Sequence, residues 1–379
     1  MPSPESIADE LGQLDLPRGE GVYLVGGTVR DLLLGRANFD VDIAVEGDAL
    51  AFARGLGGEV TAHGRFGTAA VRFPDGRRID VVTARRETYP APAALPDVEA
   101  GTIEDDLARR DFTVNAMAVS LGVDFGRLVD PHRGREDLDA RVIRVLHPRS
   151  FVDDPTRIFR AVRYESRLGF RMDSETERLA REGVAGTALL TPARMREEVV
   201  ALLSEHEAGW ALDRLAELAA VPQLEPGLID RLDALRAELD PGAPLWRLRL
   251  AALAAAHSGL AERLSLRRPD ARAVEDAVTL APRLAEATDP VAIADLASRA
   301  PEAALLALAH GDTPALRNWF TRLRDVRLEI GGSDLAELGV PESPRVGEIL
   351  EELRRRKLRG ELDGRQAELD AARELIADG

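Results

Sequence analysis

Near its N-terminus the chain reads GGTVRDLLLG over residues 26–35 and FDVDI over residues 39–43. The apolar residues 21–25 come first and predict a strand, which turns at Gly26 and Gly27 into a short helix. The second segment alternates polar and apolar residues, as a half-buried strand does. Strand, glycine turn, helix and strand in this order predict a mixed α/β domain.

Asp40 and Asp42 lie two positions apart on the second predicted strand, so both carboxylates project from one face. Like charges this close repel unless a cation lies between them, and Mg²⁺ prefers carboxylates together with phosphate and water oxygens. Two such ions can activate an attacking hydroxyl and stabilise a leaving pyrophosphate. An Asp-x-Asp pair on its own is more often a solvated strand edge, but its position after a glycine turn favours nucleotide chemistry.

The glycine turn suits a triphosphate. Gly26 and Gly27 let a phosphate approach the backbone closely, and the amides that open the following helix can bind it. Arg30, within that helix, is a candidate phosphate contact.

The chain divides into a mixed part and a helical part. Further elements expected before residue 140 are a helix over 48–56, strands over 69–73 and 77–83, a loop over 89–101 and a helix over 104–121. From about residue 151 strand patterns disappear, and Leu, Ala and Arg recur at helical spacing. The predicted fold is therefore an α/β head with a small mixed sheet, followed by all-α segments. We divide it into a head over 1–140, a neck over 141–205, a body over 206–300 and a tail over 301–379.

Composition excludes several classes of protein. The chain has 379 residues and no cysteine, so a disulfide scaffold, a cysteine zinc site and a thiol nucleophile are excluded. No stretch reaches the ~18 apolar residues of a membrane span, and residues 1–13 lack a secretory pattern, so we expect a cytoplasmic protein. The net charge of −16 argues against a nucleic-acid partner, but residues 101–200 hold 18 acidic and 17 basic side chains, which allows a local cationic surface.

The glycine turn and helix at residues 26–35 and the strand at residues 39–43 together resemble the head-domain signature of class II tRNA nucleotidyltransferases and bacterial poly(A) polymerases. Four further segments are similar to motifs of that family. They are RRDFTVNA at 109–116, similar to the ribose-binding motif; residues 130–138, similar to the hinge between head and neck; DDPTR at 153–157, similar to the nucleotide-selecting motif; and residues 191–203, similar to its supporting helix. The resemblance covers about residues 20–205 and, more weakly, residues 334–375.

The resemblance implies roles for four residues of the head. Asp80 lies where the family has a third metal carboxylate, although it could instead counter Arg78. The ribose-binding motif supplies three nucleotide-binding side chains, Arg110, Asp111 and Asn115. In that motif, which we expect to be helical, the arginine can meet a phosphate and the aspartate can accept a ribose hydroxyl, which favours ribonucleotides. The alternative is that these charges cap a helix.

Asp154 and Arg157 are three residues apart, so on a helix they share one face and offer an acceptor beside donors to the edge of a base. The family reads CTP and ATP against UTP and GTP in this way, without a nucleic-acid template. Arg160, Arg163 and Arg167 extend a basic stripe from Arg157, which would line the nucleotide pocket or the path of the RNA. They could equally form an exposed face paired with acids such as Glu165.

Two other segments bear on the substrate. The loop over 88–96 lacks the basic cluster that many CCA-adding relatives carry, and it resembles a version that also occurs in enzymes adding only part of the triplet. The basic run near the end of the chain consists of Arg354, Arg355, Arg356 and Lys357. It would bind tRNA phosphates from a helix, or it is a solvated face paired with acids such as Glu351.

The resemblance therefore implies a template-independent tRNA nucleotidyltransferase that adds C, A or both from CTP and ATP to the tRNA 3′ end, with Asp40 and Asp42 holding two Mg²⁺ ions. Enzymes that add only CC or only A, and a poly(A) polymerase, are the nearest alternatives. A non-catalytic RNA-binding protein is more distant, because the set Asp40, Asp42 and Asp80 is intact. The expected partner is tRNA, and neither a membrane nor a protein partner is implied.

Overall fold

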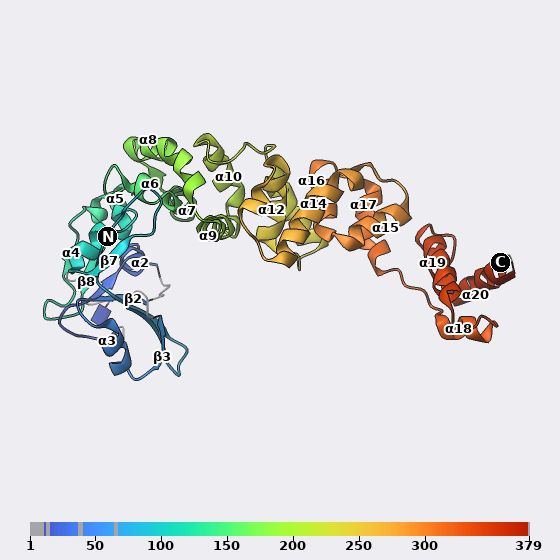
Figure 1. Ribbon diagram of the computed structural model, residues 1–379, viewed down its shortest axis with the longest axis horizontal. Coiled ribbons are helices and arrows are strands. Elements are labelled where there is room, and N and C mark those ends of the chain that lie inside the picture. Colours follow the sequence, from blue (N-terminus) through green and yellow to red (C-terminus); the bar gives the residue numbers. More distant parts are fainter. Residues whose placement is uncertain (1–10, 13–15, 37–40, 64–66, 378–379) are drawn as a thin grey trace. The chain divides into compact units, whose positions relative to one another are not determined.

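The computed structural model describes residues 11–12, 16–36, 41–63 and 67–377. The chain forms two compact units (Figure 1). The first contains the residues up to Glu198 together with Glu205–Val221, and the second contains Val199–Ser204 together with the residues from Pro222 onward. The finer division into head, neck, body and tail stays a prediction.

A seven-stranded mixed sheet forms the centre of the first unit, in the order β3-β4-β5-β2-β1-β8-β9. Its strands are β1 (Val22–Val25), β2 (Val41–Val45), β3 (Glu59–His63), β4 (Thr68–Arg72), β5 (Arg78–Thr83), β8 (Ala118–Ser120) and β9 (Leu128–Val129). Neighbouring strands are antiparallel except β2 and β5, which are parallel and place Asp42 opposite Asp80. The predicted α/β head with a small mixed sheet is confirmed.

The predicted turn between β1 and the helix that follows it is also present. The helix α2 (Gly27–Leu33) begins directly after Gly26, whose φ of 66° lies in the region that favours glycine. A Cβ at Gly26 would lie 2.5 Å from Nη1 of Arg110, so a side chain here would displace that arginine. The glycine therefore serves both the turn and the close approach of a cationic group.

Two expectations for the head are wrong. The predicted helix over 104–121 is helical only as α4 (Ile103–Ala108); a 3₁₀ turn (Thr113–Asn115) and the strand β8 follow it. Residues 116–121 are all buried, and a short apolar run that is covered on both faces carries no period to tell a strand from a helix. The predicted loop over 89–101 ends in a strand, β7 (Asp97–Ala100), which pairs with β6 (Arg85–Thr88).

Helices complete the first unit. They are α3 (Ala49–Gly55) in the head and then α5 (Gly134–Ala140), α6 (Ser150–Asp153), α7 (Thr156–Leu168), α8 (Ser174–Gly183), α9 (Pro192–Leu203, whose last turn belongs to the second unit) and α10 (Ala208–Glu217). Two residue pairs, β10 (Val142–Ile143) and β11 (Arg171–Met172), form a short parallel ladder among them. The fully buried Glu165 joins these pieces: it accepts hydrogen bonds from the Met172 N–H (2.8 Å) and from Nε of Arg214 on α10 (3.0 Å).

The second unit is helical. Its helices are α11 (Leu228–Leu239), α12 (Leu245–Ala256), α13 (Leu260–Arg263), α14 (Arg268–Glu286), α15 (Pro290–Arg299), α16 (Pro301–His310), α17 (Pro314–Thr321), α18 (Gly332–Glu337), α19 (Pro344–Leu358) and α20 (Gly364–Ala377). Residues 302–309 of α16 are all buried, so this helix lies inside the bundle, against α11 and α14. Among the residues described, no helix combines the length and the apolar character that crossing a membrane requires.

Candidate nucleotide-binding site

A cavity of about 470 Å³ lies in the first unit where α2, β2 and the start of α7 approach one another. Ten of the residues predicted from the sequence line it, namely Gly27, Arg30, Asp42, Arg110, Asp111, Asn115, Asp154, Arg157, Arg160 and Arg167. The cavity is within the size range of ligand sites, about 300–1,000 Å³. It therefore brings together the predicted phosphate, ribose and base contacts, which come from segments far apart in the sequence.

Of the two predicted metal carboxylates in the described residues, Asp42 and Asp80, only the first lines this cavity. Asp42 lines it, and the Asp42 backbone N–H donates to the Thr28 hydroxyl (3.1 Å). Asp80 is the register partner of Asp42 on the neighbouring parallel strand, so the two side chains project from the same face of the sheet. Asp80 also pairs with Arg78 (2.8 Å), which was the alternative role considered for it. Asp40 lies outside the described residues.

The donor chemistry at this edge suits Mg²⁺. Asp42 and Asp80 offer carboxylate oxygens on adjacent strands, and such hard oxygen ligands are the type that Mg²⁺ takes from proteins. Within the described ranges no group of three or more acidic or histidine side chains is close enough to hold a metal. The assignment of metal ligands therefore stays a prediction.

Arg30, the predicted phosphate contact, is buried in the cavity wall. Its guanidinium binds Asp31 (2.9 Å) and the Asn115 Oδ1 (2.7 Å). The amide nitrogen of Asn115 in turn donates to Asp111 Oδ1 (3.0 Å). Asn115 is thus a bridge that accepts from a cation with one atom and donates to an anion with the other.

Asp111 is an ionised acceptor held in place by its neighbours. It receives hydrogen bonds from the Phe112 N–H and Asn115 at one oxygen, and two from Arg160 (2.7 and 2.9 Å) at the other. Burial by itself raises the pKa of Asp111, but the Arg160 charge and the Asn115 hydrogen bond outweigh it and hold the pKa below its ordinary value. Four donors already fill the carboxylate, so a ribose hydroxyl that donates to it has to displace one of them.

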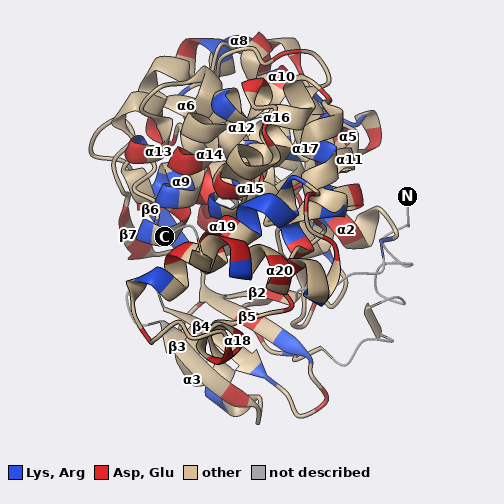
Figure 2. Cartoon of the chain, turned by 90° about the vertical axis from the view of Figure 1, so that its right-hand side faces the viewer, with Lys and Arg blue, Asp and Glu red and all other residues tan. Residues whose placement is uncertain are grey.

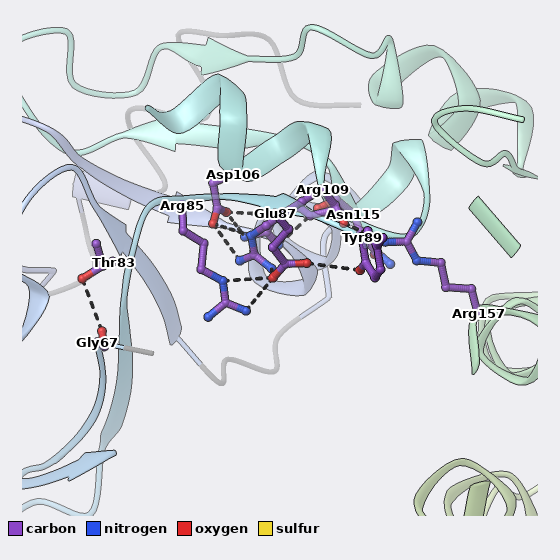
Figure 3. Close-up of polar contacts among 10 residues, drawn as sticks. Gly67, Thr83, Arg85, Glu87, Tyr89, Asp106, Arg109, Asn115 and Arg157 are labelled. Carbon is purple, nitrogen blue, oxygen red and sulfur yellow. Dashed lines mark hydrogen bonds and ion pairs between the residues drawn. The ribbon is translucent and has the colours of Figure 1, made fainter. Parts of the chain in front are cut away.

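A network of charges that the sequence did not reveal supports the other side of the cavity (Figure 3). The fully buried Asp106 accepts from Arg109 (2.7 Å) and Arg110 (2.8 Å). Glu87 on β6 accepts from Arg109 (3.1 Å) and from the hydroxyl of Tyr89 (3.2 Å). Burial raises the pKa of Tyr89 to about 12, so this hydroxyl keeps its proton as a donor at neutral pH.

The predicted base-selecting pair lines the cavity, but not as two residues of one helix. Asp154 has an extended backbone, because Pro155 disfavours the helical region for the residue before it. Its carboxylate accepts from the Thr156 N–H (3.0 Å) and from Arg194 on α9 (2.7 Å). Arg157, in the first turn of α7, is buried.

Of the four arginines in the predicted basic stripe on α7, three line the cavity and one does not. Arg160 lines the cavity, whereas Arg163 does not and pairs instead with Glu198 (3.2 Å) and Glu205 (3.3 Å). The face of α7 that does line the cavity carries Arg157, Arg160, Tyr164 and Arg167. These positions follow the helical spacing of three, four and three residues, a signal that would have placed the tyrosine in the site and excluded Arg163.

Basic and acidic residues both lie on α19 (Figure 2), and ion pairs largely neutralise its basic run. Each of its four side chains has a carboxylate partner: Arg354 with Asp295, Arg355 with Glu351, Arg356 with Glu352 and Lys357 with Glu368. Glu368 is fully buried and also accepts from two backbone N–H groups, so the lysine contact stabilises the local fold. RNA binding by this run stays a prediction.

Residues 22–144 match the model of the poly A polymerase head domain. A CC-adding tRNA nucleotidyltransferase of Deinococcus radiodurans is 35% identical over 89% of this chain and 86% of its own length. This chain belongs to the tRNA nucleotidyltransferase family. The family resemblance indicated by the sequence motifs is thereby confirmed.

Two further members of the family are similar over most of the chain. An A-adding tRNA nucleotidyltransferase of Geobacter sulfurreducens is 36% identical over 97% of this chain, but the match spans only 46% of that relative. The chain spans about half or less of the length of the A-adding relatives it matches. The solved structure of a Thermotoga maritima CCA-adding enzyme complexed with tRNA has a TM-score of 0.76 and 32% identity, covering 98% of this chain and 93% of that one.

Proposed function

We propose that the chain is a template-independent nucleotidyltransferase that adds C and A from CTP and ATP to the 3′ end of tRNA. The observation that carries this proposal is one cavity that holds both Asp42, at the carboxylate edge, and the Asp154/Arg157 pair. A nucleotide bound there would have its phosphates near the metal carboxylate Asp42 and its base against the Asp154/Arg157 pair. The names of the relatives, which add A, CC or CCA to tRNA, support this substrate.

In the proposed reaction the terminal ribose hydroxyl of tRNA gives its proton to water, and its oxygen forms a bond to the α-phosphorus of the nucleotide. The bond from that phosphorus to the bridging oxygen breaks, and pyrophosphate leaves with the electron pair. Asp40, Asp42 and Asp80 would hold Mg²⁺, which when bound supplies charge neutralisation and lowers the pKa of the hydroxyl. Arg110 lies beside the glycine turn and is held there by Asp106, which supports a role for it in binding the triphosphate.

Base selection follows from the chemistry of the Asp154/Arg157 pair. Cytosine and adenine each present an amino donor beside a ring-nitrogen acceptor, whereas uracil and guanine present a carbonyl beside an N–H. A carboxylate acceptor next to guanidinium donors matches the first pattern and leaves groups unpaired with the second, which costs binding energy. The pair can therefore select CTP and ATP without a nucleic-acid template.

Addition of only part of the triplet is the second candidate. The loop after β6 carries no basic side chain over residues 89–96, and it is docked on the neighbouring helices. The Ala93 N–H donates to the Val152 carbonyl (3.1 Å), and Arg194 donates to the Ala93 carbonyl (2.7 Å). A loop fixed in one place favours one fixed nucleotide preference over a switch from C to A.

The test is nucleotide incorporation into three tRNA transcripts that end at the discriminator base, at C and at CC. Each receives CTP, ATP or both, with UTP and GTP as controls. If the transcript that ends at the discriminator base gains CCA and addition then stops, the enzyme adds the full triplet. If that transcript gains only CC, or if only the transcript that ends at CC is extended and gains a single A, the enzyme adds part of the triplet. Long A tails identify a poly(A) polymerase, and no incorporation overturns the proposal in favour of a non-catalytic RNA-binding protein.

A further inference from the structure

Ser150, the first residue of α6, contacts both members of the base-selecting pair from behind the cavity wall. Its hydroxyl accepts a hydrogen bond from Nη1 of Arg157 (2.7 Å), and its carbonyl accepts one from the Asp154 N–H (3.1 Å). Ser150 itself is fully buried and does not line the cavity, so it has no direct access to a bound nucleotide. We propose that Ser150 is a positioning residue that sets the fidelity of nucleotide selection by orienting Arg157.

The geometry at Arg157 explains why one hydroxyl carries this role. A guanidinium has five N–H donors in one plane, and in the described part of the chain two of them have protein partners. Nη1 donates to Ser150, and Nη2 donates to the backbone carbonyl of Arg109 (2.8 Å). Two bonds at the two terminal nitrogens fix the plane of the group, so the remaining N–H donors have a set direction.

Removing the Ser150 hydroxyl leaves Arg157 held at one end only. The guanidinium can then turn about its bond to the Arg109 carbonyl, and its free donors no longer keep a fixed position relative to the Asp154 carboxylate. A base whose edge carries the wrong pattern gains alternative hydrogen bonds from the mobile group. The correct base loses little, because it still finds donors, so the expected effect falls on discrimination more than on turnover.

The inference rests on the proposed function, because it assumes that Arg157 meets the base. The experiment compares kcat/KM for CTP and for UTP on the tRNA transcript that the wild-type chain extends. We expect Ser150→Ala to lower the CTP/UTP ratio about tenfold, since a hydrogen bond to a charged group contributes enough to account for that factor. Binding of tRNA and the temperature of unfolding should stay close to wild type.

Two further substitutions separate the hydrogen bond from the packing. Ser150→Cys keeps a side chain of similar size but offers only a weak acceptor, so it should behave like Ser150→Ala. Ser150→Thr keeps the hydroxyl and should retain the wild-type ratio. The matched control is Ser120→Ala, which removes a buried serine hydroxyl that accepts from the Gly122 N–H (3.2 Å) away from the cavity, and it should leave the ratio unchanged.

A double mutant tests whether Ser150 acts through Arg157. In a chain that already carries Arg157→Ala, adding Ser150→Ala should not change the CTP/UTP ratio further. If the ratio falls by the same factor in both backgrounds, Ser150 acts by another route and the inference is wrong.

The remaining outcomes are equally distinct. A folded Ser150→Ala chain with the wild-type ratio, or an equal loss for both nucleotides, overturns the inference while leaving the proposed function standing. Should the alanine chain not fold, the comparison of Ser150→Cys with Ser150→Thr decides, and equal ratios for those two also overturn it. If the wild-type chain incorporates no nucleotide, it is the proposed function that has failed.

Discussion

The bridge made by Asn115 gives the sharpest prediction, because replacing its amide nitrogen by an oxygen turns an attraction to Asp111 into a repulsion. In Asn115→Asp, the oxygen that accepts from Arg30 is kept. The nitrogen that donates to Asp111 at 3.0 Å becomes a second carboxylate oxygen facing the first. Two unit charges at this separation repel by about 5.5 kcal/mol at an effective dielectric constant of about 20. Arg30 and Arg160 reduce that figure, so it is an upper bound.

The repulsion makes the effect depend on pH. One proton shared by the two carboxyl groups removes the repulsion and restores a donor between them, so the folded state of the variant raises the pKa of this pair. A group whose pKa is raised by folding contributes stability at low pH and loses it as pH rises through the folded value. We therefore expect Asn115→Asp to be nearest to wild type at about pH 5 and to lose stability progressively up to about pH 8.

The measurement is urea unfolding of both chains across that pH range. Asn115→Ala is the control: it loses both hydrogen bonds to charged partners, at about 1.5–3 kcal/mol each, and its deficit should not change with pH. A deficit of Asn115→Asp that is the same at pH 5 and pH 8 would refute the reasoning, because it would mean that the new carboxyl group does not face Asp111.

Three further predictions concern catalysis, stability and acid sensitivity. Asp42→Ala should lower nucleotide transfer at least about 100-fold with tRNA binding retained, because metal binding at this carboxylate supplies several kcal/mol; transfer at the wild-type rate would remove Asp42 from the metal site. Glu165→Ala should lower the free energy of unfolding by about 3 kcal/mol, because Nε of Arg214 and the Met172 N–H both lose a buried acceptor, although Arg214 keeps Glu177 and Glu217 as partners. A loss below about 1 kcal/mol in urea denaturation, the scale of one ordinary hydrogen bond, would contradict this. Burial lowers the pKa of His132 and of His147 below the ordinary value of 6.5. The positive charge of Arg157 lowers the pKa of His147 further. The unfolded chain then takes up protons that the folded chain does not, so stability should be highest above pH 6.5 and fall as pH drops below it, and replacing both by glutamine should flatten that slope.

The sequence was informative where local chemistry determines the structure. The glycine turn before α2 was predicted correctly because glycine is the residue type that readily adopts the conformation such a turn needs, and Gly26 has the required positive φ. Asp154 and Arg157 reach the cavity because Pro155 ends one helical segment and opens the next. These are short-range effects, which a single sequence contains.

The features of the fold and the site that the sequence did not predict depend on contacts between distant segments. Asp106 and Glu87 hold Arg109 from two different elements. They lie 19 positions apart in the sequence, and nothing in the segment between them indicates that both meet one side chain. The strand β8 looked helical because its burial on both faces comes from neighbours in the sheet. Its charge alone suggested that Arg163 belongs to the basic stripe that lines the cavity. Its position on α7 instead directs it toward Glu198, so helical phase matters more than residue type on this helix.

The single parallel pairing in the sheet has a consequence for how the protein folds. β2 and β5 can lie side by side only after residues 46–77 have looped from the end of one strand to the start of the other. Closing a long loop costs chain entropy before any contact repays it, whereas helices form from neighbours in the sequence. The carboxylates of Asp42 and Asp80 are therefore brought together by completed tertiary structure, and the acidic edge of the cavity exists only in a chain whose sheet has closed.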